Sequence, residues 1–233
     1  MSCLCQISKM CVLLWKLIMA KIIPGILTDN EADYHKRLLR AEHVADLIQV
    51  DLIDGKFAPN TTIGPDIIKK YHSSSMLEVQ LMVDFPQSYI NELVKLEYVS
   101  RIIFPFEVDS DTNQDIYSIK AFGKQAGLSV NPETPISAVL YYMDDIDVLC
   151  IFSASPGFAG KKLEEEVYAR IKQAKKLSPN LPVEVDIGVN FDTAQKLAEA
   201  GADFLVATSV LHNSDDYRVA YEKLAKLAEV SKN

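Results

Sequence analysis

From Lys21 onward, one pattern repeats along the sequence: a short apolar run rich in β-branched residues, followed by an amphipathic stretch with helical spacing. The apolar runs are nearly continuous instead of alternating, as expected for strands covered on both faces. Strands that alternate with helices in this way predict a parallel sheet built from βαβ units. The expected strands are Lys21–Leu27, Leu47–Ile53, Leu77–Met82, Val99–Phe106, Gly127–Val130, Val148–Phe152, Val183–Asp186 and Phe204–Ala207.

The segments between these runs carry helix start and stop signals. Pro65, Pro86 and Pro135 suit the first turn of a helix, where no backbone N–H is needed. Gly127 and Gly201 follow helical segments, where a positive φ is common. The expected helices are Asn30–Ala45, Pro65–Tyr71, Pro86–Lys95, Gln114–Gln125, Pro135–Met143, Leu163–Leu177, Asp192–Ala200 and Asp215–Val230.

Eight strand–helix units in a chain of 233 residues fit one closed barrel better than an open sheet. No linker rich in Ser, Gly or Pro divides the sequence, and no glycine-rich dinucleotide fingerprint follows the first strand. We therefore predict the α/β class, with a single (β/α)₈ TIM barrel over residues 21–233. Such a barrel carries its active site at the C-terminal ends of the strands.

The first twenty residues differ from the rest of the chain. They contain no acidic residue, and Lys16 interrupts an apolar run far shorter than the roughly 20 residues that a membrane span needs. No small-residue cleavage motif precedes the first strand. We interpret residues 1–20 as a disordered or mis-assigned N-terminal extension, with a targeting segment as the alternative, and we predict no membrane span.

Charge and cysteine content narrow the function classes. A formal net charge of −8 argues against nucleic acid as a partner, since that would require a basic face. A small anionic substrate is still compatible, because clustered backbone N–H groups bind phosphate in acidic proteins. The four cysteines show no disulfide framework or zinc spacing, and Cys150 has the setting of a buried strand residue. The chain is predicted to be cytoplasmic.

Several motifs together resemble one enzyme family. The run Val50–Pro65 is similar to the long signature of ribulose-phosphate 3-epimerases, and Gln80-Leu81-Met82, Asn131–Pro135, Ser155–Gly160 and Val185–Asn190 follow in that family's order. The resemblance implies a TIM barrel that moves the proton on carbon 3 of a ketopentose phosphate from one face to the other.

Two aspartates match the family's acid–base pair. Asp51 and Asp186 lie at the ends of two predicted strands, and carboxyl groups on opposite sides of a substrate suit proton transfer. The alternative is a structural role in which each carboxylate caps a helix or pairs with a lysine. We predict that both are catalytic and that the substrate is a phosphorylated ketose.

The family's metal site is altered in this sequence. The resemblance implies a divalent metal held by two histidines and the same two aspartates, but Gln49 and Gln80 stand at the histidine positions. An amide oxygen is a poor ligand for zinc and a tolerable one for magnesium. No cofactor is therefore firmly predicted, and a divalent metal would have only Asp51 and Asp186 as family ligands. The four histidines, at positions 35, 43, 72 and 212, are expected at the surface.

Two hypotheses follow for the reaction without a metal. The side-chain amides of Gln49 and Gln80 could donate N–H bonds to the developing oxyanion. Repulsion between Asp51 and Asp186 would raise the pKa of one of them and leave it protonated.

The phosphate-binding positions are partly retained. The family binds phosphate through backbone N–H groups in glycine-rich loops after three strands. Ile187 and Thr208 stand where glycine is expected, and Gly25 replaces a serine after the first strand. Ile187 would crowd the anion or change the peptide geometry. The predicted substrate-binding residues are Gln49, Gln80, Met82, Gly157, Phe158, Ala159, Gly160, Gly188, Thr208 and Ser209.

Three functions are weighed on this basis. The first is an isomerase of a ketopentose phosphate, either metal-independent or using a weakly held hard cation. The second is a catalytically impaired relative that binds a sugar phosphate. The third, a lyase or aldolase, would need a lysine at a strand end for a Schiff base, and no strand clearly supplies one. A homo-oligomer and the identity of the sugar are left open.

Overall fold

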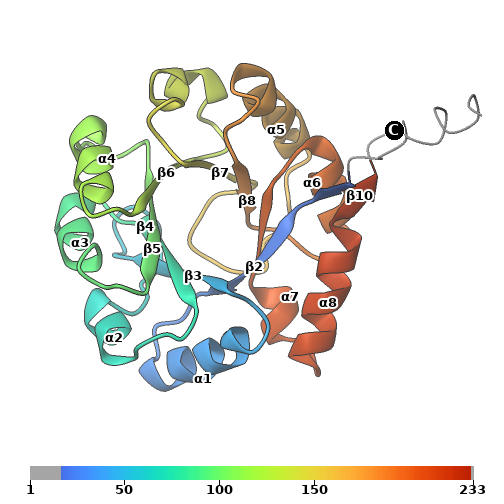
Figure 1. Cartoon of the computed structure of the whole chain (residues 1–233), viewed down its shortest axis with the longest axis horizontal. Helices are drawn as coiled ribbons and strands as arrows, with labels where there is room; N and C mark the ends of the chain where they lie inside the picture. The colour runs from blue at the N-terminus through green and yellow to red at the C-terminus, as the bar shows by residue number, and fades with distance from the viewer. Residues whose placement is uncertain (1–16, 232–233) are drawn as a thin grey trace, which may run out of the picture.

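The computed structural model describes residues 17–231. Eight parallel strands pair in chain order and close into a barrel, so the predicted single (β/α)₈ architecture is confirmed (Figure 1). The strands of the barrel are β2 (Lys21–Ile26), β3 (Leu47–Ile53), β4 (Met76–Met82), β5 (Val99–Pro105), β6 (Gln125–Val130), β7 (Val148–Phe152), β8 (Val183–Asp186) and β9 (Phe204–Ala207).

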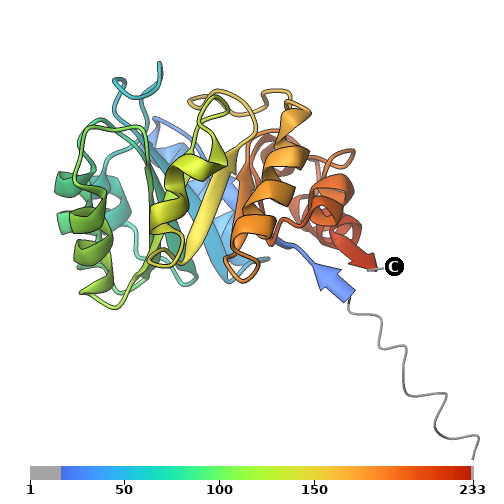
Figure 2. The same ribbon diagram turned by 90° about the horizontal axis from the view of Figure 1, so that it is seen from above.

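Helices surround the barrel on its outside, and the two views together show them as one continuous outer layer (Figures 1 and 2). Asn30, Asp111 and Asp216 cap three of them by accepting a backbone N–H at the third helical position. The helices are α1 (Glu31–Glu42), α2 (Pro65–Lys70), α3 (Pro86–Leu93), α4 (Thr112–Lys120), α5 (Glu166–Leu177), α6 (Ala194–Ala200), α7 (Ser209–His212) and α8 (Tyr217–Leu227), with a 3₁₀ helix, η1 (Ile136–Tyr142), after β6.

Two predicted helices differ in detail from those observed. The segment after Pro135 is a 3₁₀ helix, in which Ala138 N–H bonds to the Pro135 carbonyl three residues back. The expected helix Gln114–Gln125 ends at Lys120, because Gly123 adopts a left-handed φ of 70° and Gln125 already belongs to β6. The first difference changes the hydrogen-bond spacing of the segment, and the second shortens a helix where the chain turns into β6.

The strands bury side chains on both faces. Ile48, Val50 and Leu52 of β3 pack in the main core beneath the helices. The intervening residues Gln49 and Asp51 are also buried, and Asp51 lines a pocket at the mouth of the barrel. This alternation turns polar side chains into the barrel interior, where the strands of a closed sheet face one another.

The lower interior of the barrel holds a buried ion cluster that the sequence analysis did not anticipate. Arg101 Nη1 of β5 lies 2.5 Å from Glu78 Oε2 of β4 and 3.5 Å from Glu184 Oε2 of β8. Arg101 Nε donates to Gln125 Oε1 at 2.9 Å, and the guanidinium carbon lies 4.7 Å from the centre of the Phe204 ring. Two buried carboxyl groups therefore share one guanidinium.

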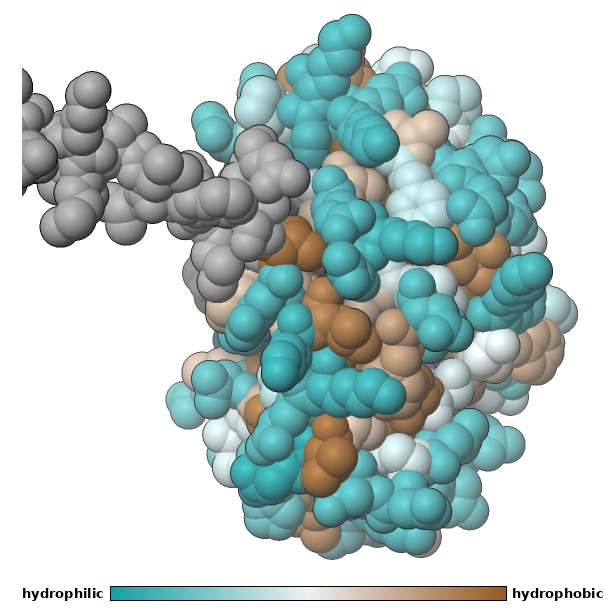
Figure 3. All heavy atoms as spheres, turned by 90° about the vertical axis from the view of Figure 1, so that its right-hand side faces the viewer, coloured by the Kyte–Doolittle hydropathy of each residue, from teal (hydrophilic) through white to brown (hydrophobic). Residues whose placement is uncertain are grey.

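The N-terminal segment contributes a strand. β1 (Leu17–Met19) pairs antiparallel with β10 (Glu229–Ser231), outside the barrel. The end of the predicted extension, residues 17–20, thus includes a strand that pairs with β10. The prediction for residues 1–16 lies outside the described residues. Within residues 17–231, no helix is long and apolar enough to cross a membrane. Figure 3 shows hydrophilic side chains over much of the face on the right of Figure 1, with apolar side chains between them.

Glycine has different roles at the two positions predicted to follow helices. Gly201 adopts φ 111° at the end of α6, as expected. The expectation for Gly127 is wrong: it lies inside β6, and the left-handed residue after α4 is Gly123. A Cβ on Gly127 would lie 2.6 Å from Val148 Cγ1 and 2.8 Å from Ile103 Cγ1. The barrel interior, not the backbone conformation, requires glycine at this position.

This crowding predicts the effect of Gly127→Ala. We expect the free energy of unfolding to fall by about 1–3 kcal/mol, because the new methyl group overpacks the barrel interior. Urea denaturation measures the loss. Adding Val148→Ala should recover part of it, whereas Gly123→Ala, whose Cβ would meet nothing within 4 Å, should combine additively with Val148→Ala. Additive behaviour of Gly127→Ala with Val148→Ala would contradict the crowding argument.

Candidate active site

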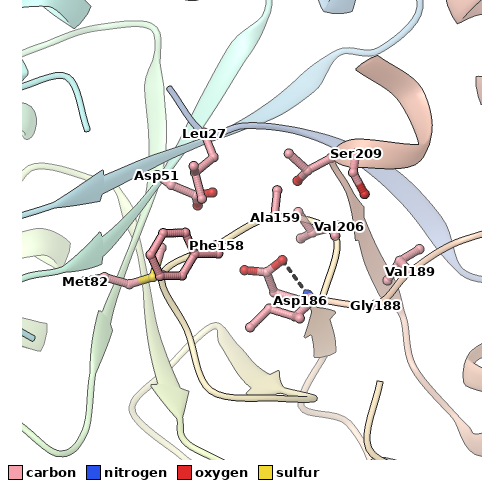
Figure 4. Close-up of a pocket in the computed structure, with 14 residues that line it drawn as sticks. Leu27, Asp51, Met82, Phe158, Ala159, Asp186, Gly188, Val189, Val206 and Ser209 are labelled. Atoms are coloured by element: carbon pink, nitrogen blue, oxygen red, sulfur yellow. Dashed lines mark hydrogen bonds between the residues drawn. The ribbon is translucent and has the colours of Figure 1, made fainter. Parts of the chain in front are cut away.

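A pocket lies at the C-terminal ends of the strands, with about 420 Å³ of empty space, part of it open to solvent (Figure 4). The structure brings together here all the predicted site residues except Gln49 and Gln80. Leu27, Val189 and Val206 also line the pocket and were not predicted, because apolar residues at strand ends look like core residues in a sequence. The lining residues are Leu27, Asp51, Met82, Gly157, Phe158, Ala159, Gly160, Asp186, Ile187, Gly188, Val189, Val206, Thr208 and Ser209.

The two aspartates enter this pocket from separate strands. Asp51 is on β3 and Asp186 is the last residue of β8, and their side chains point into the same space (Figure 4). They are only 3% and 7% exposed. The Ile187 N–H donates to Asp186 Oδ1 at 2.6 Å, and Ser153 N–H donates to the Asp186 carbonyl oxygen at 3.1 Å. The pocket therefore contains two closely held, poorly hydrated carboxyl groups.

Burial sets the protonation of this pair. It raises the pKa of Asp51 well above its ordinary value, and the charge of Asp186 raises it further, against a hydrogen bond from Gln49. Burial also raises the pKa of Asp186, to about 6, with hydrogen bonds from the Ile187 N–H and Gln49 opposing it and the charge of Glu78 adding to it. The raised pKa of Asp51 favours its protonated form, which a general acid requires. A pKa of about 6 leaves Asp186 mainly ionised near neutral pH, as a general base requires.

Gln49 and Gln80 lie beneath the pocket and are fully buried. Gln49 Nε2 donates to Asp51 Oδ1 at 2.8 Å, and Gln80 Nε2 is 3.6 Å from the Cys150 sulfur. The oxygen atoms of both amides have no hydrogen-bond partner. In this arrangement each amide nitrogen directs one N–H toward a protein atom, and donation of the other N–H to a substrate oxyanion stays a prediction.

The residues present do not fit a metal of the kind held by histidine ligands. Within residues 17–231, no group of three or more His, Cys, Asp or Glu side chains is placed to hold a metal ion. His35, His43 and His72 are exposed, as predicted. Gln49 also turns an N–H donor, not an oxygen, toward Asp51. No step of the chemistry is therefore assigned to a metal.

The family signature holds the loop that covers one side of the pocket. Asn60 Nδ2 donates to the Gly157 carbonyl oxygen at 2.7 Å. A Cβ on Gly157, which has φ 111°, would lie 3.1 Å from the Ala58 Cβ. Phe158 follows and lies beside Met82 over the pocket (Figure 4). The signature residues thus position the loop 157–160, in which Gly160 is also left-handed, at φ 80°.

Ile187 retains the backbone geometry of a glycine. It has φ 73°, the same value as Gly188, and is the one non-glycine residue of 17–231 with a positive φ. Such a conformation costs roughly 1–2 kcal/mol for a residue with a side chain. The Ile187 side chain packs on the cluster of Ile53, Met82 and Phe152, and its carbonyl oxygen accepts from Ser153 Oγ at 2.6 Å. The expected change in peptide geometry is therefore not observed.

Gly25 and Thr208 lie against each other in the fold, although they are 183 residues apart in the sequence. A Cβ on Gly25 would lie 2.3 Å from Thr208 Oγ1, so a side chain at position 25 would require Thr208 to move. The Thr208 hydroxyl group therefore occupies the space beside β2.

His212 is not the surface residue that the sequence analysis predicts. Its Nε2 bonds to the Gly25 carbonyl oxygen at 2.9 Å, and its ring lies 5.3 Å from that of Tyr217. Burial lowers the pKa of His212 to about 4. This contact ties the short helix α7, which follows Thr208, to β2.

The half-buried His212 predicts a pH-dependent stability. The unfolded chain binds a proton near pH 6.5 and the folded protein only near pH 4, so stability falls as pH drops through this interval. We expect His212→Gln to lessen that fall by on the order of 2 kcal/mol. Urea denaturation at pH 7 and pH 4.5 measures it. The exposed His35→Gln serves as control, and equal slopes for both variants would contradict the assignment.

Comparison with known proteins agrees with the geometry. Residues 21–212 match the model of the ribulose-phosphate 3 epimerase family. Ribulose-phosphate 3-epimerase of Bacillus subtilis is 33% identical over 214 residues, covering 88% of this chain and 98% of that protein. The cytoplasmic isoform of Oryza sativa is 33% identical over 221 residues, covering 92% and 96%. The chain belongs to the ribulose-phosphate 3-epimerase family.

Solved structures support the fold independently. The tryptophan synthase α-subunit of Pyrococcus furiosus superposes with a TM-score of 0.65 at 18% identity, over 91% of this chain and 97% of that one. Orotidine 5′-phosphate decarboxylase of Pyrococcus horikoshii gives 0.62 at 14% identity, over 89% and 98%. At such low identity, these similarities concern the barrel alone.

Proposed function

We propose that this protein inverts carbon 3 of a ketopentose phosphate by proton transfer between two carboxyl groups. The observation that carries the proposal is the placement of Asp51 and Asp186 in one pocket, both poorly hydrated and both with a raised pKa. Membership of the epimerase family supports the same reaction class.

In this reaction the ionised Asp186 removes the carbon 3 proton from one face. The protonated Asp51 then delivers its proton to the same carbon from the other face, so the configuration is inverted. Each turnover exchanges the protonation states of the two side chains, which suits a reversible isomerisation. The proposed reaction therefore uses both carboxyl groups, one as the base and the other as the acid.

The remainder of the pocket would hold and enclose the substrate. Backbone N–H groups of the loops 157–160 and 187–188, with the segment 208–209, are the donors proposed for the phosphate. Leu27, Met82 and Phe158 provide apolar walls on the side of the reacting carbon. Excluding water there strengthens the electrostatic effect of each remaining polar group.

A second candidate is a protein that binds a sugar phosphate without turning it over. The observation in its favour is the use of the amide N–H groups of Gln49 and Gln80 within the protein. An enediolate would then lack the strong electrophile that a bound cation supplies, which is worth several kcal/mol in enzymes that have one. Binding of ribulose 5-phosphate without proton exchange would identify this case.

Solvent-deuterium exchange at carbon 3 of ribulose 5-phosphate tests the proposed reaction. We expect the wild-type protein to incorporate deuterium in the presence of a chelator. Asp51→Asn and Asp186→Asn should each reduce the rate by about 10²-fold or more, because each removes one proton-transferring group. Asp192→Asn, at an exposed position, is the matched control. Binding without exchange by the wild-type protein would overturn the isomerase proposal.

The pKa of the base predicts the acid side of the pH profile. We expect log kcat/KM to fall below about pH 6, where Asp186 becomes protonated and can no longer accept the carbon 3 proton. It should fall again at higher pH as Asp51, whose pKa is also raised, loses its proton. Initial rates between pH 5 and 9 measure both limbs. A profile with no acid limb in this range would remove Asp186 from the role of base.

A further inference from the structure

Gln49 lies beside the aspartate pair, whose two carboxyl groups point into the same pocket. Its Nε2 donates to Asp51 Oδ1 at 2.8 Å, and hydrogen bonding from the same side chain is among the effects that lower the pKa of Asp186. The side chain is fully buried, so water does not compete for these contacts. A primary amide nitrogen carries two hydrogens, which matches two carboxyl acceptors.

We propose that the side-chain amide nitrogen of Gln49 takes the place of a shared cation between Asp51 and Asp186, so that it holds the two carboxyl groups in position and closes the site to a divalent metal. Gln49 is then a positioning residue for the proposed reaction. This proposal concerns the same site as the proposed isomerase function. Only its kinetic test depends on that function, and its metal titration does not.

The geometry gives two reasons why a metal is excluded. A cation that reached both carboxyl groups would meet the N–H donor of Gln49, which is the wrong polarity for a ligand. Gln80, at the second position where the family resemblance implies a histidine ligand, directs its nitrogen toward Cys150 of β7. Neither position offers the imidazole nitrogen that favours zinc and similar ions.

The competing arrangement is an all-oxygen site for a hard cation. The oxygen atoms of Gln49 and Gln80 are buried and have no partner, and rotation of the Gln49 amide would turn its oxygen toward Asp51. Such a site would suit Mg²⁺ or Mn²⁺. Binding of either ion at this position is therefore the result that would overturn the proposal.

Metal titration separates these arrangements without measuring activity. We expect wild-type protein to bind no more Co²⁺, Mn²⁺ or Mg²⁺ in equilibrium dialysis than Asp51→Asn/Asp186→Asn does. The double variant Gln49→His/Gln80→His should bind one Co²⁺ and show its visible absorption bands. Gln49→His alone should gain more affinity than Gln80→His alone, because only the first removes the amide between the carboxyl groups. Wild-type binding that is lost in the double asparagine variant would refute the proposal.

A kinetic test examines the positioning role separately. Gln49→Met has a similar length but no hydrogen-bond donor, so we expect kcat to fall by about 10²-fold while KM changes little. Circular dichroism and the melting temperature establish whether the variant is folded. A folded Gln49→Met with wild-type kcat would refute the positioning role. The metal titration would still decide whether the site excludes a divalent metal, even for an inactive protein.

Discussion

The site depends on the closure of the sheet between its first and last strands. β2 pairs with β9 from Lys21↔Phe204 to Pro24↔Ala207, which joins the two ends of the barrel sequence into one ring. Closure leaves no free edge and forces alternate side chains of all eight strands toward a common axis. Asp51 of β3 and Asp186 of β8, which are separated by two strands across this junction, meet only because the ring is closed.

The barrel interior that results is strongly acidic. Asp51 and Asp186 lie at its mouth, Glu78 and Glu184 lie beneath them, and Arg101 is the cation that contacts the two glutamates. Few water molecules can screen charges in such a place, so the charges of Asp186 and Glu78 raise the pKa of Asp51. A metal ion is one way to hold aspartates together under these conditions. The amide of Gln49 is another, and it uses hydrogen bonds in place of charge.

The sequence predicted the barrel and most of the pocket because both depend on local signals. Apolar runs located the strands to within a few residues, and the motif around Asp51 marked one strand that lines the pocket. Prediction from the sequence failed where the role of a residue depends on a partner far along the chain. Gly127 was predicted to end a helix, but it lies in a strand and leaves room for the side chain of Val148. His212 was predicted to be exposed, but it hydrogen-bonds to the Gly25 carbonyl oxygen. The ion cluster around Arg101 was missed for the same reason.

The sequence by itself determined the eight strand–helix units, the positions of the two aspartates and the glutamines at positions 49 and 80, since hydrophobic periodicity and residue identity are properties of the chain. Only the tertiary structure decided which way each amide points, that Ile187 keeps a glycine-like backbone, and that Thr208 fills the space beside Gly25. These depend on distances between atoms on different strands, and barrel closure sets those distances.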